Sequence, residues 1–434
     1  MLCSPAAALA DGYTVGAATR DITPAGDVNF GGFGLGDGSV LPEDLIGSGD
    51  RGHAQGQRIA VRAMVIRDGH QAIALASVET QGMFAAYKEG PYGLIDIANQ
   101  VAADIPGLPA NHIIISSDHT HSGPDTIGAW GGVPDSYLRH IHDQAVAAIE
   151  TAYLGRRKAT LRIGRSDARD LIYNQACTEA LNQNPTPSYP GPDVCPVPGT
   201  DGFFRVIQAK DRKTHVVIGT LADYAAHGTV GGANGLHGDW GQFLSDAMSK
   251  RYGGVGIGMV GALGGTQPCR PTCSFTKKSN PGYSVKDRRT AIVLNYMAHV
   301  RDSVAHSRPV YGDVEGTQRL IREPITGPLV FGLFTLGGQV GAPMMRATTF
   351  PWTTATTIRT PVTVLRVGNV VFDGTPGEGF PSIGEGVRKA VTNEQEVMQI
   401  GLANDQLGYL IAPATYVPVI AAEADFNDDI LFNV

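Results

Sequence analysis

The sequence predicts a mixed α/β fold in which layered, mixed β-sheets are flanked by helices. Short runs rich in β-branched residues alternate with stretches of helical periodicity, which is typical of sheets with covering helices. The connections between these runs have irregular lengths, which favours mixed sheets. No Ser- or Pro-rich linker, block of like charge or internal repeat interrupts the 434 residues. We therefore expect one dominant domain over residues 11–434.

Eight runs have the composition expected of strands. They are Arg62–Ile66, Ile73–Ser77, Ile113–Ser117, Thr160–Ile163, Phe204–Gln208, Val216–Leu221, Val362–Val367 and Val370–Phe372. Helical periodicity is clearest in Ser136–Tyr153, Gly241–Arg251 and Val285–Val304. The first of these places Leu138, Ile141, Ala145, Ala148 and Ile149 on one face. These helices are expected to flank the sheets.

The charge distribution argues against nucleic acid as a partner. The formal net charge is −7, both signs are scattered, and the sequence has no basic cluster or base-stacking aromatic pattern. The long apolar run at residues 328–345 contains four glycines, two prolines and Gln339, which a transmembrane helix would carry poorly. We expect no transmembrane segment and interpret this run as a buried loop or strand, or as one wall of an apolar ligand groove.

The segment with the most chemical information follows the predicted strand Ile113–Ser117. His119 and His121 stand two residues apart, with Gly123-Pro124 close behind. A strand running through both histidines would aim both imidazoles at one point, because residues two apart share a face. Gly-Pro would stop that strand at a sheet edge or strand end, where sites usually open. The alternative is a pair of solvated loop histidines, since His-x-His is a common pattern.

Two later segments offer further donors. One apolar run ends in His227-Gly228, and another leads to Pro376-Gly377-Glu378. Each is interpreted as a strand that delivers one donor at its C-terminal end, beside a glycine that lets the backbone turn close to a ligand. Two neutral imidazoles and a carboxylate are the usual protein part of a catalytic zinc site, with the fourth position left for water. The sequence has no His-Glu-x-x-His motif, which excludes the familiar metalloprotease arrangement.

Together these motifs resemble the catalytic domain of the neutral ceramidases, the zinc amidases that hydrolyse the N-acyl bond of ceramide. The matching segments occur in the family's order and span nearly the whole chain. They are residues 15–24 (VGAATRDITP), Arg62–Ile66, the His-Thr-His-Ser-Gly-Pro block at 119–124, His227–Thr229 with Asn234 and Gly238–Trp240, Pro376–Glu378, and Gly401–Tyr409. The block at 119–124 is quite specific for the family. The resemblance implies a ceramidase-like fold with a metal site at strand ends.

The resemblance also implies a zinc ion bound by His119, His227, Glu378 and Tyr409. It gives His121 a catalytic role beside the metal. A tyrosine ligand does not follow from spacing alone, because a reference pKa near ~10 makes the phenol a poor ligand unless a metal lowers it. Judged without the family, Tyr409 would close a strand with its hydroxyl in solvent.

The glycine-rich turn that contains Gly265 and Thr266 is a candidate oxyanion site, and we take these two residues as catalytic candidates. Asp118, Asp223 and Asp239 are candidates for acceptors that fix histidine tautomers; otherwise they are ordinary surface or capping aspartates.

The chain also departs from the family pattern. Where the family has Asn-Arg-Ser, this chain has Asn174-Gln175-Ala176, and a neutral amide cannot replace a fixed cation. Thr266 stands in place of the serine of the family's glycine-rich segment. Gln175 and Tyr416 are the substrate-binding candidates. Because the sequence ends at Val434, we expect no C-terminal immunoglobulin-like domain of the kind found in many ceramidases.

The N-terminus and the cysteines indicate export, so we expect a secreted or periplasmic protein. Residues 1–10 are small and apolar and end in Ala8-Leu9-Ala10, which has the form of a signal-peptidase site; a frayed alanine-rich terminus is the alternative. Four of the five cysteines lie beyond this segment. We favour two local disulfides, Cys177–Cys195 and Cys269–Cys273. The second pair could instead bind metal, because it forms Cys-x-x-x-Cys.

The sequence thus indicates a zinc-dependent amidohydrolase whose substrate is a ceramide-like or other hydrophobic N-acyl molecule or lipid. This interpretation is compatible with contact between the protein and a membrane surface. Two alternatives stay open. One is an exported zinc esterase or amidase acting on a compact substrate, and the other is a ceramidase-like binding protein without catalysis.

Overall fold

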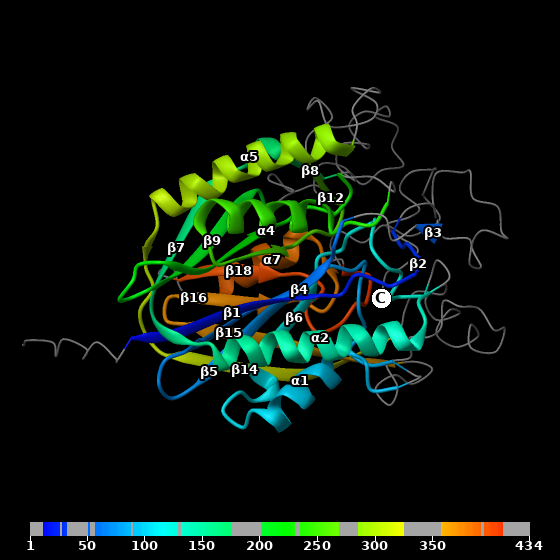
Figure 1. The fold of residues 1–434 in the computed structure, drawn as a ribbon, viewed down its shortest axis with the longest axis horizontal. Coiled ribbons are helices and arrows are strands. Elements are labelled where there is room, and N and C mark those ends of the chain that lie inside the picture. The colour runs from blue at the N-terminus through cyan, green and yellow to red at the C-terminus, as the bar shows by residue number, and fades with distance from the viewer. Residues whose placement is uncertain are drawn as a thin grey trace, which may run out of the picture.

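The computed structural model describes residues 12–26, 28–32, 51–52, 57–87, 90–128, 132–174, 201–230, 235–268, 285–324, 357–391 and 395–410. It confirms a mixed α/β fold with layered sheets and covering helices (Figure 1). The predictions for residues 1–10, residues 328–345, Gln175, Tyr416 and the four cysteines beyond the N-terminus concern positions outside the described residues.

The main sheet has nine strands. They are β1 (Tyr13–Asp21), β4 (Ala60–Arg67), β5 (Ala72–Val78), β6 (Ile113–Ser117), β7 (Arg157–Asp167), β9 (Phe203–Asp211), β10 (Val217–Tyr224), β11 (Val255–Val260) and β13 (Arg308–Pro309). The order is β11-β10-β9-β7-β1-β4-β5-β6, with β13 beside β7. Both outer pairs, β5 with β6 and β10 with β11, are parallel, and the pairs between them are antiparallel. Because β11 also contacts β4, β5 and β6, the sheet curves until its two edges approach each other.

A second sheet packs against the first. Its strands are β14 (Val314–Pro324), β15 (Thr357–Val367), β16 (Val370–Gly374) and β18 (Glu396–Ile400), in that order. A shared apolar core joins the layers; Ile114 and Leu221 from the main sheet meet Leu365, Phe372 and Met398 from the second, and all five are fully buried. Removal of this apolar surface from water is the main force that holds the two sheets together.

Helices cover the main sheet on its other face. They are α1 (Leu94–Asp104), α2 (Asp135–Leu154), α4 (Asp239–Tyr252) and α5 (Val285–Ala305), while α7 (Pro381–Ala390) precedes β18. The α2 helix packs on β1 and β4, and α4 packs on β11 (Figure 1). The apolar face predicted for α2 is buried, as expected for an amphipathic helix. None of the helices in the described part of the chain is both long and apolar enough to cross a membrane.

Short paired segments complete the described structure. They are β2 (Val28–Asn29) with β3 (Arg51–Gly52), β8 (Ile172–Asn174) with β12 (Thr266–Pro268), and β17 (Glu378–Gly379) with β19 (Tyr409–Leu410). Single 3₁₀ turns occur at Ala110–His112 and Arg169–Leu171.

All eight predicted strands and all three predicted helices are confirmed; β6 has the predicted ends, and the others have shifted ends. The sequence did not predict the strands β1, β11, β14 and β18. For β11 the reason is that Gly256 and Gly258 lower the strand propensity of that run. The structure explains both glycines by the close approach of α4. A Cβ at Gly256 would lie 2.0 Å from the Ser245 carbonyl oxygen, and one at Gly258 would lie 2.6 Å from that of Gly241.

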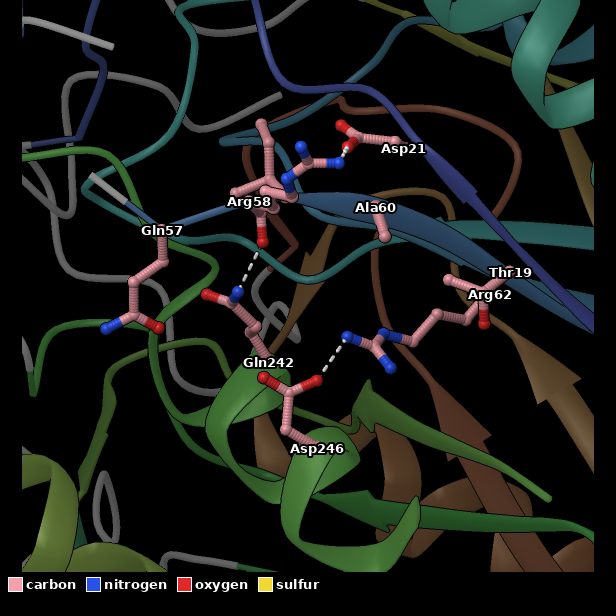
Figure 2. Close-up of a pocket in the computed structure, with 9 residues that line it drawn as sticks. Thr19, Asp21, Gln57, Arg58, Ala60, Arg62, Gln242 and Asp246 are labelled. Atoms are coloured by element: carbon pink, nitrogen blue, oxygen red, sulfur yellow. Dashed lines mark hydrogen bonds and ion pairs between the residues drawn. The ribbon is translucent and has the colours of Figure 1, made fainter. Parts of the chain in front are cut away.

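A buried ion pair joins β4 to the residue that follows β5. The Arg62 guanidinium donates to Glu79 at 2.7 Å and to Asp246 of α4 at 2.7 Å. Arg62 also lines an open cavity of about 490 Å³ (Figure 2). On another wall of this cavity, Arg58 pairs with Asp21, but there both side chains are largely exposed.

We expect Arg62→Met to lower the free energy of unfolding by ~3–5 kcal/mol, because it leaves the buried Glu79 carboxylate without its cation. The matched control is Arg58→Met, which removes an exposed pair and should cost less than ~1 kcal/mol. Urea unfolding of both variants at neutral pH measures the difference. Equal losses would show that the Arg62 pair stabilises no more than a surface contact.

Candidate metal centre

The curvature of the main sheet brings the segments after β6 and β10 side by side. Thr120 and Gly228 form a parallel bridge, and the His121 amide donates to the Gly228 carbonyl at 2.9 Å. A Cβ at Gly228 would lie 2.5 Å from the His119 carbonyl oxygen, so only glycine permits this approach. The bridge places His119 and His227 on facing segments.

The two buried histidines are held in one tautomer by main-chain carbonyls. Nδ1 of His119 lies 2.7 Å from the Gln81 carbonyl oxygen, and Nδ1 of His227 lies 2.7 Å from that of Thr266. A carbonyl oxygen only accepts, so each Nδ1 carries the proton. Each Nε2 therefore presents a lone pair toward the centre of the site.

The segments that follow β16 and β18 hold the other two candidate ligands. Glu378 and Tyr409 are partners in the short parallel pair of β17 and β19. Glu378 Oε2 lies 3.3 Å from His119 Nε2 and 3.2 Å from His227 Nε2. The Tyr409 hydroxyl lies 3.1 Å from His227 Nε2. The four residues nominated from sequence thus lie together, two on segments that follow β6 and β10 and two in the pair β17 and β19. Their role as ligands stays a prediction.

This donor set fits a metal cation. Nε2 of His119 and Nε2 of His227 each lie within 3.3 Å of Glu378 Oε2. This oxygen has no hydrogen-bond donor among the described residues. Burial alone would raise the pKa of Glu378, but its interactions with the His119 and His227 rings outweigh burial and hold this pKa well below its usual range. A cation between the three atoms satisfies them without protonating either histidine.

His121 completes a cluster of three histidines whose ring nitrogens all lie within 4.8 Å of one another. Its Nε2 is 3.2 Å from His119 Nε2, and its ring meets His119 edge-on. Burial and the neighbouring His119 and His227 lower the pKa of His121 well below its usual value, so its ring is neutral at neutral pH. Gly32 packs on this ring, and a Cβ there would lie 2.3 Å from His121 Cγ.

The prediction that one strand runs through both histidines is wrong. β6 ends at Ser117, and His119 has a φ of 55°, in the left-handed region that L-residues avoid. The imidazoles still converge, because the left-handed turn and the bridge at Thr120 aim them at one centre. The positive φ at His119 is the local strain that the site imposes.

Comparison with known proteins extends this picture. No protein-family model matches the sequence, and no curated protein sequence matches it. The crystal structure of neutral ceramidase from Pseudomonas aeruginosa aligns with a TM-score of 0.69 and 20% identity, over 94% of this chain and 70% of that chain. The chain has the neutral ceramidase fold. A second solved structure, of a ceramidase complexed with C2, gives a TM-score of 0.71 and 18% identity, over 98% of this chain and 73% of that chain.

Within this ceramidase fold, the glycine-rich turn is mostly committed to internal hydrogen bonds. The Thr266 amide donates to Leu263 and the Gly264 amide donates to Gly379. The Thr266 hydroxyl donates to the carbonyl oxygens of Ala225 and Leu263. In this arrangement the Thr266 carbonyl orients His227, and Gly265, with a φ of 66°, remains the oxyanion candidate of the turn.

The three aspartates do not orient the facing histidines, because carbonyl oxygens do so. Asp118 accepts from the Thr120 amide, Asp223 lies 3.8 Å from Arg205, and Asp239 accepts from the Trp240 amide. The expectation that they fix the tautomers of His119 and His227 is therefore wrong. Every residue has a main-chain carbonyl, so sequence motifs could not show which carbonyls accept from the histidines.

Two residues of the last loop were not predicted to act at the site. The main-chain N–H of Asn404 donates to the Ile115 carbonyl of β6, and the Ile115 N–H donates to Asn404 Oδ1. The side-chain Nδ2 of Asn404 donates to the Ile113 carbonyl and the Thr363 hydroxyl. Gln406 donates to Glu378 Oε1 at 3.1 Å. The first residue ties the Tyr409 segment to β6, and the second contacts a candidate ligand directly.

Proposed function

We propose that this protein is a zinc-dependent amidohydrolase that cleaves the amide bond of a hydrophobic N-acyl compound. One observation carries the proposal, which is the convergence of His119, His227 and Glu378 on a single buried point. The likeness in fold to neutral ceramidases supports the choice of reaction. The proposed ligands are these three residues and Tyr409.

The protein's own groups would carry the proton transfers. Zinc, when bound, lowers the pKa of water from ~15.7 toward ~7 and polarises a carbonyl. The neutral His121 ring, beside the ligands but not required to be one, would accept a proton from the attacking water and return it to the leaving amine. The Gly265 amide would stabilise charge on the carbonyl oxygen.

For the substrate, we propose an N-acyl amide other than natural ceramide. Gln175 replaces the cation that the ceramidase pattern places near the metal. A hydrogen bond to a charged group contributes ~1.5–3 kcal/mol, so its loss should weaken recognition of a polar head group by roughly 10- to 150-fold.

Turnover of a panel of long-chain N-acyl amides tests the proposal. We expect the zinc-loaded protein to hydrolyse N-acyl amino acids or fatty amides with a higher kcat/KM than ceramide, and the chelated protein to be inactive. Zinc readdition should restore the rate. Hydrolysis that survives complete removal of metal would overturn the mechanism, and a clear preference for ceramide would overturn the proposed substrate.

A further inference from the structure

Gln406 donates a hydrogen bond to Oε1 of Glu378, the carboxylate oxygen that is not directed at the histidines. It is only 4% exposed, and its Nε2 donates to Glu378 Oε1 at 3.1 Å. A carboxylate oxygen only accepts, so this contact fixes which end of the Gln406 amide faces Glu378. The inner oxygen, Oε2, is the one directed at both histidines.

The position of Gln406 is set by the fold around it. Its amide N–H donates to Asp405 at 2.9 Å, and the same buried carboxylate accepts from the Ala85 amide and the Thr360 hydroxyl. Its side chain lies on Gly82, where a Cβ would come within 2.9 Å of Gln406 Cγ. These contacts fix the backbone of Gln406 and the start of its side chain beside Glu378.

This arrangement separates the two oxygens of Glu378. A cation that used both oxygens would draw Oε1 toward itself and away from Gln406 Nε2, which would weaken a buried hydrogen bond. A catalytic metal site needs a coordination position that protein atoms do not fill.

We propose that Gln406 is a positioning residue that restricts Glu378 to one metal-ligating oxygen and so keeps a coordination position open. The inference rests on the proposed metal-dependent function, and it concerns the number of ligand atoms rather than the substrate. Oε1 of Gln406 has no hydrogen-bond partner among the described residues, so no second hydrogen bond pulls the side-chain amide away from Glu378.

The test uses Gln406→Met, which keeps the length of the side chain and removes both polar ends. The matched control is Gln208→Met in β9, because Gln208 is also buried and also donates one side-chain bond, to Thr220 at 3.0 Å. Wild type and both variants are loaded with Co²⁺, whose visible absorption reports coordination number, and are then titrated with azide, which binds an open position.

In the wild type and in Gln208→Met we expect one Co²⁺ per chain and a spectrum that azide changes. In Gln406→Met we expect one Co²⁺ per chain, a weaker visible absorption from the added carboxylate oxygen, and loss of the azide response. Amidase kcat should fall by roughly 10- to 100-fold, as is usual when a partner of a metal ligand is removed.

A Gln406→Met spectrum and azide response equal to wild type would overturn the inference. So would loss of Co²⁺ from Gln406→Met while Gln208→Met retains it, because the residue would then be needed for binding itself. A wild-type protein that binds no metal would instead overturn the proposed function. A wild type that binds Co²⁺ and azide but does not hydrolyse amides would contradict the proposed amidase function only. The role of Gln406 would then be decided by the spectra of the variants.

Discussion

Replacing His227 by alanine will remove both the bound metal and the amidase activity. The His227 ring is 1% exposed, and its Nε2 lies 3.2 Å from Glu378 Oε2 and 3.1 Å from the Tyr409 hydroxyl. Without this imidazole only three of the four proposed ligands remain, and a water in its place binds a metal more weakly than a fixed imidazole. His119→Ala should behave in the same way, because its Nε2 faces the same carboxylate oxygen.

Metal analysis of the purified variants, together with turnover of an N-acyl amide, checks this result. His112→Ala is the matched control. His112 is also buried and its Nδ1 also lies close to a main-chain carbonyl oxygen, that of Ala72 at 3.0 Å, but it has no contact with the site. We expect the control to keep one zinc per chain. Full zinc occupancy in both His119→Ala and His227→Ala would refute the ligand assignment.

The second large effect is expected for His121→Ala, which should keep its zinc and lose ~10²- to 10⁴-fold in kcat, the usual contribution of a general acid or base. His121 is the most exposed of the three clustered histidines, and its ring stands edge-on to His119. Its loss should therefore spare the buried donor set.

Zinc content, circular dichroism and single-turnover rates separate the roles of His121. Partial rescue of His121→Ala by added imidazole would support a proton-transfer role, because the truncated side chain leaves a space beside the metal. Loss of zinc from this variant would instead make His121 a ligand. An unchanged kcat would exclude any role in proton transfer.

Sequence reasoning found the candidate ligands that follow apolar, strand-like runs. His119, His227 and Glu378 each sit at the end of an apolar run, and the strand period is enough to place such ends at a sheet edge. Tyr409 followed only from the family resemblance, since a tyrosine after a loop has no metal-binding pattern of its own. The structure brings all four together.

The remaining features depend on contacts between distant segments. The left-handed turn at His119 exists because the segment after β10 pairs there, and local propensity gives no sign of it. The carbonyls of Gln81 and Thr266 orient the histidines through main-chain atoms, which every residue possesses. Gln406 is an ordinary polar residue in sequence and gains its meaning only when it meets Glu378.

Segments that follow strands of the main sheet hold two of the four proposed ligands, and segments that follow β16 and β18 of the second sheet hold the other two. This division links the supply of metal to folding. A cation held by residues 119, 227, 378 and 409 would act as a reversible cross-link between the layers, closed only in the native state. A ligand that binds only the folded chain stabilises it by RT ln(1 + [L]/Kd), or ~4 kcal/mol at a thousandfold excess over Kd. Zinc scarcity would then reduce the amount of intact protein as well as its activity, because the unfolded fraction is open to proteases.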